Sequence, residues 1–164
     1  MNESVDLQRT VAGKASLQGI GLHTGEETTI TVGPRDPDEG IVFVRKDLPG
    51  EPEIKVCAEN ASIEDCLYLT ALGTGEQQIF TVEHVLAACV GLGIDNLTIE
   101  LNSKEPPIID GSALPFVEII RKAGIVTQDR PRRYIEIDKP IWLFENGLEL
   151  AVIPSHRLEV TYKI

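Results

Sequence analysis

The segment spanning residues 81–93, Thr-Val-Glu-His-Val-Leu-Ala-Ala-Cys-Val-Gly-Leu-Gly, constrains the fold of this chain more than any other stretch. Its nearly continuous apolar character predicts a short helix buried in the core. Thr81 can cap the first turn of this helix, and Gly91 and Gly93 can end it. Burial does not explain Glu83 and His84, a carboxylate and an imidazole at the point where the helix enters the core.

Alternating apolar and polar residues predict β-strands on both sides of this helix. The expected strands span residues 11–18, 28–32, 41–45, 54–57, 67–72 and 97–101. The glycine-rich residues 19–25 would join the first two strands as a hairpin.

A second helix is predicted over residues 113–123, with Ser112 as its N-cap and Gly124 as its C-cap. Its apolar positions recur at helical spacing and would form a buried stripe: Phe116, Val117, Ile119, Ile120 and Ala123. We therefore expect an α+β fold, a two-layer sandwich of a mostly antiparallel sheet with two helices on one face.

The pattern of strands stops at a polar, proline-containing stretch and then restarts. We expect a first α+β domain over residues 1–126, a linker over 127–133, and the start of a second domain over 134–164. Strands are predicted at residues 134–137, 141–144, 148–153 and 158–164, with an Asn146-Gly147 hairpin turn between the second and third. Because no helix covers these strands, the second α+β domain is expected to be incomplete.

Composition and charge exclude several classes of protein. The formal net charge of -11 argues against a nucleic-acid-binding protein, which needs a basic surface. The N-terminus lacks the pattern of a signal peptide, and the longest apolar run, residues 85–94, covers roughly half a membrane span. Cys57, Cys66 and Cys89 lack metal-finger spacing and are expected to be reduced, structural thiols. We expect a cytoplasmic chain without a transmembrane segment.

Glu83 and His84 are the strongest candidates for chemistry. Neighbours on a helix point about 100° apart, so they suit different roles better than joint ligation of one ion. The imidazole of His84 can bind zinc while the carboxylate of Glu83 takes a proton from a water that the ion activates. The structural alternative is a solvated glutamate that favours the helix dipole beside a hydrogen-bonded histidine. An isolated Glu-His pair does not by itself decide between these readings.

Other candidate residues are weaker, and the visible set of zinc ligands is incomplete. His23, in the glycine-rich connection, is either a cleft residue whose neighbouring amides hold a polar group or an ordinary turn residue. His156 is expected in a surface turn. Asp110 precedes a predicted helix, where turn and capping chemistry explain it.

Four short motifs resemble one family. They are Gly-Leu-His-Thr-Gly at 21–25, Thr-Val-Glu-His at 81–84, Gly-Leu-Gly-Ile-Asp-Asn at 91–96, and Pro-Ile-Ile-Asp-Gly-Ser at 107–112 with Pro115-Phe116 after it. In this order and spacing they resemble the zinc-dependent UDP-3-O-acyl-N-acetylglucosamine deacetylases of lipid A biosynthesis. The resemblance covers the chain from about Gln8 onwards.

The resemblance implies an amide hydrolase built from two similar α+β domains, with the active site between them. His84 matches the zinc ligand from the first domain and Glu83 the general base, so that acetate is released from a UDP-linked, acylated N-acetylglucosamine. His23, Leu67 and Tyr68 match positions near the substrate. Asp110 matches a motif that we interpret as structural.

The family's remaining zinc ligands, a histidine and an aspartate on a helix of its second domain, have no counterpart up to Ile164. We therefore expect the N-terminal part of a deacetylase, inactive without its C-terminal half because one ligand does not hold zinc tightly. A non-catalytic module that binds a nucleotide sugar or a protein is the alternative. A further one is an interaction fragment that pairs through an edge strand near Tyr162.

Overall fold

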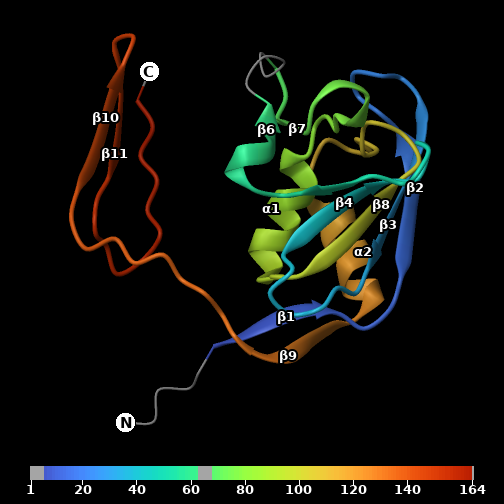
Figure 1. Ribbon diagram of the computed structural model, residues 1–164, viewed down its shortest axis with the longest axis horizontal. Helices are drawn as coiled ribbons and strands as arrows, with labels where there is room; N and C mark the ends of the chain where they lie inside the picture. Colours follow the sequence, from blue (N-terminus) through green and yellow to red (C-terminus); the bar gives the residue numbers. More distant parts are fainter. Residues whose placement is uncertain (1–5, 63–67, 164) are drawn as a thin grey trace. The chain divides into compact units, whose positions relative to one another are not determined.

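The computed structural model describes residues 6–62 and 68–163, and the chain divides into two compact units between Arg132 and Arg133 (Figure 1). We call residues up to Arg132 unit 1 and the residues from Arg133 onwards unit 2. Each unit is described by itself.

A five-stranded sheet forms the centre of unit 1, in the order β2-β3-β8-β4-β5. Its strands are β2 (Ala15–Ile20), β3 (Glu27–Gly33), β8 (Leu97–Leu101), β4 (Ile41–Arg45) and β5 (Glu53–Lys55). Neighbouring strands are antiparallel except β4 and β8, which run parallel. The predicted mostly antiparallel sheet and the hairpin around residues 19–25 are confirmed.

The alternation of side chains in β8 shows why one face of the sheet, which we call the dry face, is buried against the core. Leu97, Ile99 and Leu101 are fully buried, whereas Thr98 and Glu100 between them are partly exposed. Successive side chains of a strand point to opposite faces, so the three apolar residues line the core and the two polar residues face away from it. The strand has the bounds predicted from this same alternation.

Two helices cover the dry face of the sheet: α1 (Glu83–Leu92) and α2 (Leu114–Ala123) (Figure 1). Side chains from both helices and from the sheet belong to one buried cluster, which includes Val85, Cys89, Phe116, Ile120, Ile30, Phe43 and Ile99. The predicted α+β fold is therefore confirmed. Among the described residues, no helix has the length and apolar character needed to cross a membrane.

The ends of α1 differ from expectation at one side only. Val82 is the N-cap residue and makes no side-chain cap hydrogen bond, so the prediction that Thr81 caps the helix is wrong. The hydroxyl of Thr81 instead donates to Oε1 of Glu105 at 2.6 Å. Of the two glycines predicted to end the helix, Gly93 does so in the left-handed conformation at φ 65°, whereas Gly91 lies within the last turn.

The start of α2 also lies close to its predicted position. The prediction that Ser112 is the N-cap is wrong, because Ala113 is the N-cap residue. The hydroxyl oxygen of Ser112 nevertheless accepts a hydrogen bond from the amide of Leu114 at 3.1 Å. Gly124 follows the last turn at φ 81°, and its amide donates to the carbonyl of Arg121. The predicted C-cap is confirmed.

The single strand predicted over residues 11–18 is in fact two strands. β1 (Leu7–Val11) ends before β2 begins, and it pairs antiparallel with β9 (Ile125–Pro131), so the two form a separate ribbon of unit 1 (Figure 1). Residues 127–131, expected within a linker, therefore lie in a strand. Pairing with β1 provides hydrogen-bond partners for the backbone of this polar segment. The sequence pattern does not reveal this pairing.

A buried polar network fixes the β1–β9 ribbon to the rest of unit 1. Asn96 is 1% exposed, and its side-chain amide donates to the side-chain oxygens of Gln8 and Gln128, each at 2.7 Å. Its carbonyl oxygen accepts the amide of Gly40 at 2.8 Å. Because every polar atom of this side chain has a partner, its burial next to the core carries little penalty.

Short elements connect β5 to α1. They are the 3-10 helices η1 (Ala58–Asn60) and η2 (Gly75–Gln77) and the two-residue strands β6 (Ala61–Ser62) and β7 (Ala71–Leu72). The strand predicted over residues 67–72 is thus confined to Ala71–Leu72 within the described residues, and the one predicted over 54–57 is β5, shifted by one residue at its start and shorter at its end. Cys57 and Cys89 are free thiols, and burial raises the pKa of Cys89 to about 12, as expected for an unreactive core thiol.

Unit 2 contains a β-hairpin of two strands, β10 (Ile141–Glu145) and β11 (Leu148–Val152). Asn146 and Gly147 join them with φ values of 51° and 80°, which confirms the predicted hairpin turn. Trp142 and Phe144 stack on one face of β10 with ring centroids 6.3 Å apart. The other two predicted strands are absent from residues 134–137 and 158–163, because neither segment finds a partner strand within the described part of unit 2. The division into a first domain over 1–126 and a second beginning at 134 stays a prediction.

Candidate active site

Glu83 and His84 lie in the first turn of α1, and both side chains reach solvent, with exposed fractions of 39% and 29%. Nε2 of His84 lies 4.0 Å from Oε1 of Glu83. The other carboxylate oxygen, Oε2, accepts a hydrogen bond from the amide of Thr70 at 3.1 Å. A carboxylate is favourable at a helix N-terminus, and here it is also oriented by a backbone donor.

The chain reaches this turn through an unusual backbone conformation. Thr81 has φ 54°, in the left-handed region that residues other than glycine seldom adopt. Its neighbours are fixed by backbone hydrogen bonds, from Phe80 to the carbonyl of Lys104 at 2.8 Å and from Val82 to that of Thr70 at 3.3 Å. The entry to α1 is therefore held from both sides.

Glu105 is a fully buried carboxylate between the entry to α1 and the glycine-rich loop. Oε2 accepts the amides of His23 and Thr24 at 3.0 and 2.9 Å, and Oε1 accepts the hydroxyl of Thr81 at 2.6 Å. Burial by itself raises the pKa of Glu105, but the hydrogen bonds from Thr81, Thr24 and His23 outweigh it and hold the pKa below its usual value.

Glu105 lies in a loop where no sequence motif marks it as a site residue. One signal for it is the glycine at 21, because a Cβ there would lie 2.6 Å from Oε2 of Glu105 and 2.3 Å from Oγ1 of Thr24. The sequence shows a glycine in a turn, but not that a carboxylate 84 positions later occupies the space beside it.

His23 is exposed, and the structure narrows what its loop can do. The amides of His23 and Thr24 both donate to the carboxylate of Glu105. These two amides are therefore not available to a ligand, and the role of His23 stays a prediction. The imidazole of His23 is exposed and is therefore free to contact a ligand.

The other candidate residues differ in exposure and in their hydrogen bonds. Tyr68 is 87% exposed, and Leu67 lies outside the described residues. Oδ1 of Asp110 accepts both the amide and the hydroxyl of Ser112 at 2.9 Å, and these hydrogen bonds lower the pKa of Asp110. Its predicted structural role is confirmed. His156 is an exposed residue of unit 2, in a bend as expected.

The described residues do not complete a metal site. Within residues 6–62 and 68–163, no group of three or more His, Cys, Asp or Glu side chains is placed to hold an ion. A zinc centre takes about three protein ligands, and His84 offers one. The residues described here therefore do not fit zinc by themselves.

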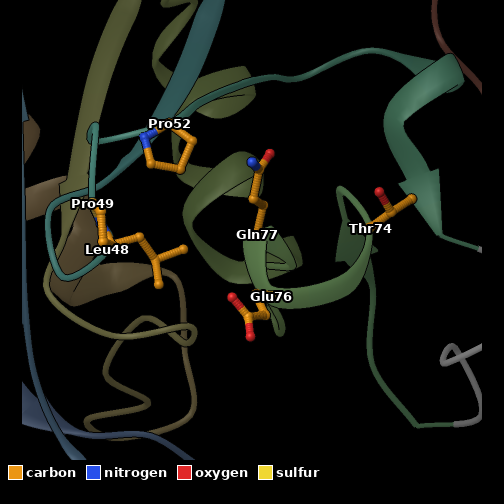
Figure 2. Close-up of a pocket in the computed structure, with 6 residues that line it drawn as sticks. All are labelled: Leu48, Pro49, Pro52, Thr74, Glu76 and Gln77. Atoms are coloured by element: carbon orange, nitrogen blue, oxygen red, sulfur yellow. The ribbon is translucent and has the colours of Figure 1, made fainter.

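A pocket of about 540 Å³ opens elsewhere on unit 1 (Figure 2). It is lined by Leu48, Pro49, Pro52, Thr74, Glu76 and Gln77. Beside it, the buried guanidinium of Arg45 donates from Nη1 to the carbonyls of Glu76 and Gln78 at 3.2 and 2.7 Å. None of the candidate site residues lines this pocket. The guanidinium of Arg45 beside it is hydrogen-bonded to backbone carbonyls and therefore has a structural role.

Comparison with known proteins gives one consistent result. The family model for the UDP-3-O-acyl N-acetylglycosamine deacetylases, LpxC, matches residues 8–164. Proteins named UDP-3-O-acyl-N-acetylglucosamine deacetylase are 41% identical over 157 residues in Syntrophus aciditrophicus, 42% over 158 in Bdellovibrio bacteriovorus, and 46% over 144 in an Anaeromyxobacter species. These alignments cover 96%, 96% and 88% of this chain, and 49%, 52% and 46% of the relatives.

The chain thus spans about half the length of the curated relatives it matches. The match begins at residue 8 and includes the glycine-rich loop, α1 with its Glu83–His84 pair, and the segment around Glu105. This chain belongs to the UDP-3-O-acyl-N-acetylglucosamine deacetylase family.

Proposed function

We propose that this chain supplies one part of the active site of a UDP-3-O-acyl-N-acetylglucosamine deacetylase. The reaction is hydrolysis of the acetamide on the glucosamine, in which water adds across the C–N bond to give acetate and a free amine. The observation that carries the proposal is the solvent-accessible Glu83–His84 pair at the start of α1 in a member of this family.

In this proposal Glu83 is the general base. Its carboxylate is accessible and oriented by the amide of Thr70, so it can take a proton from an attacking water and deliver it to the leaving nitrogen. His84, one residue further along the helix, is proposed as a zinc ligand. A bound zinc ion would polarise the acetamide carbonyl and lower the pKa of water. The remaining ligands are proposed to come from a part of the protein outside these residues.

His23, Leu67 and Tyr68 are proposed to contact the UDP-linked, acylated sugar. The exposure of His23 and Tyr68 supports this role, since neither side chain is needed to fill the core. The protein is also proposed to be cytoplasmic, as expected for an enzyme that acts on a nucleotide-linked sugar.

Residues 134–164 are proposed to begin a second α+β domain. The strands β10 and β11 have no buried residue, and they expose Trp142, Phe144 and Leu148. Apolar side chains at this density need a covering layer. The proposed partner is therefore a further segment that completes the domain.

The test is release of acetate from UDP-3-O-acyl-N-acetylglucosamine, followed by mass spectrometry, with the protein at the length of its relatives. Glu83→Ala should keep bound zinc and lower kcat by about 100-fold or more, because a general base typically contributes at least that factor. His84→Ala should lose the metal together with the activity.

Glu118→Ala, which removes an exposed carboxylate from α2, is the matched control and should leave kcat unchanged. If both Glu83→Ala and His84→Ala keep their zinc and their activity, the assigned roles are wrong. Binding of the UDP-sugar with no acetate released by the wild type would favour the non-catalytic binding module.

A further inference from the structure

The carboxylate of Glu105 connects two segments that are far apart in the sequence. One is the loop that carries His23, and the other is Thr81, two residues before Glu83. The amide of His23 lies within hydrogen-bond distance of both carboxylate oxygens, at 3.2 Å from Oε1 and 3.0 Å from Oε2. Both oxygens of one buried group are thus used to hold two candidate site segments together.

We propose that Glu105 is a positioning residue that sets where the His23 loop lies relative to the first turn of α1. Its effect on catalysis would pass through Thr81, whose left-handed backbone leads the chain into α1, and through the amides of His23 and Thr24. This inference rests on the proposed function, because it assigns Glu105 to the placement of Glu83 and His84 against the substrate-contacting loop.

The segment around Glu105 is attached to the hairpin without its carboxylate. Oδ1 of Asn102 accepts the amide of Thr29 at 2.7 Å, and the amide of Ile108 donates to the carbonyl of Ile20 at 3.0 Å. The hydroxyl of Ser103 lies 3.1 Å from Oε2 of Glu26. Loss of the Glu105 charge should therefore leave the segment in place and release the connection between the His23 loop and Thr81.

A carboxylate is a costly way to fill space in a core. An apolar side chain would fill this site without the desolvation penalty of a charge. The glycine at 21 also leaves room for the carboxylate, since a Cβ there would collide with Oε2. A charge-assisted hydrogen bond to each segment is what Glu105 adds beyond packing.

The test compares kcat and KM per bound zinc in the protein at the length of its relatives, well below its unfolding temperature. Glu105→Gln and Thr81→Val should each lower kcat/KM by about 10-fold or more with zinc retained, because misplacement of site groups by about 1 Å costs on the order of 100-fold in rate. Thr81→Ser keeps the hydroxyl and should restore nearly full activity. Ser103→Ala, which removes a neighbouring hydrogen bond of the same segment, is the control and should match the wild type.

The proposal is overturned if Glu105→Gln and Thr81→Val have wild-type kcat and KM per zinc, or if activity falls only in proportion to lost zinc. Should Glu105→Gln fail to fold, Thr81→Val decides alone. A second readout needs no activity: in amide NMR spectra of this chain, Glu105→Gln should shift His23, Thr24, Glu83 and His84. Shifts confined to His23 and Thr24 would overturn the proposal, whereas absence of acetate release by the wild type would reject the proposed function instead.

Discussion

At the scale of single residues, the buried carboxylate of Glu105 makes the stability of the chain depend on pH. Its pKa is lowered in the folded state, so the ionised form stabilises the fold at pH values above the unfolded pKa, and this contribution is lost as the pH falls through the folded pKa. Glu105→Gln should destabilise the chain at pH 7 by about 1–3 kcal/mol, since the donors around it lose a charged acceptor.

Urea unfolding at pH 7 and at pH 3 measures this difference. The difference in the free energy of unfolding between wild type and Glu105→Gln should be large at pH 7 and smaller at pH 3. Glu118→Gln, on the exposed side of α2, is the control and should change stability by less than about 0.5 kcal/mol at pH 7. An equal gap at both pH values would show that the charge of Glu105 does not contribute.

At the scale of elements, the two glycines at the end of α1 have opposite requirements. Gly91 lies within the helix with open space where a Cβ would be, whereas Gly93 has φ 65° and a Cβ there would lie 2.9 Å from Nη2 of Arg132. Gly91→Ala should therefore stabilise the chain by about 0.5–1 kcal/mol, and Gly93→Ala should destabilise it by about 1 kcal/mol or more.

Thermal unfolding followed by circular dichroism compares these two variants, each of which serves as the control for the other. A higher melting temperature for Gly93→Ala than for Gly91→Ala would contradict the assignment of Gly93 as the C-cap. Gly91 lies on the exposed side of the helix with open space around it, so the Gly91→Ala variant reports the change in helix propensity.

Element boundaries were predictable where the signal is local. β8 and β4 have their predicted bounds, because strict alternation or a dense apolar run marks a strand by itself. The N-cap of α1 was not predictable, because the hydroxyl of Thr81 donates to the buried carboxylate of Glu105 and makes no capping contact with the helix. β9 was missed for a similar reason: its polar sequence indicates a linker until β1 is beside it.

At the scale of the whole molecule, weak metal binding is expected, because the described residues offer only His84 toward the proposed zinc site. Calorimetric titration of this chain with zinc should show no tight one-to-one site, because the binding free energy of zinc depends on the complete set of ligands. The protein at the length of its relatives should bind one zinc ion tightly under the same conditions. Submicromolar binding by this chain that His84→Ala abolishes would show that the ligand set is already complete.

The sequence by itself determined the α+β class, the two helices, the hairpin at Asn146-Gly147, and the place of Glu83 and His84 at the start of α1. These follow from periodicity, capping and turn chemistry, which act between residues close in the chain. Only the tertiary structure decided that Glu105 joins the His23 loop to Thr81 and that β1 pairs with β9. Such contacts depend on which donors and acceptors from distant parts of the chain are buried together. A local sequence pattern does not reveal these long-range pairings.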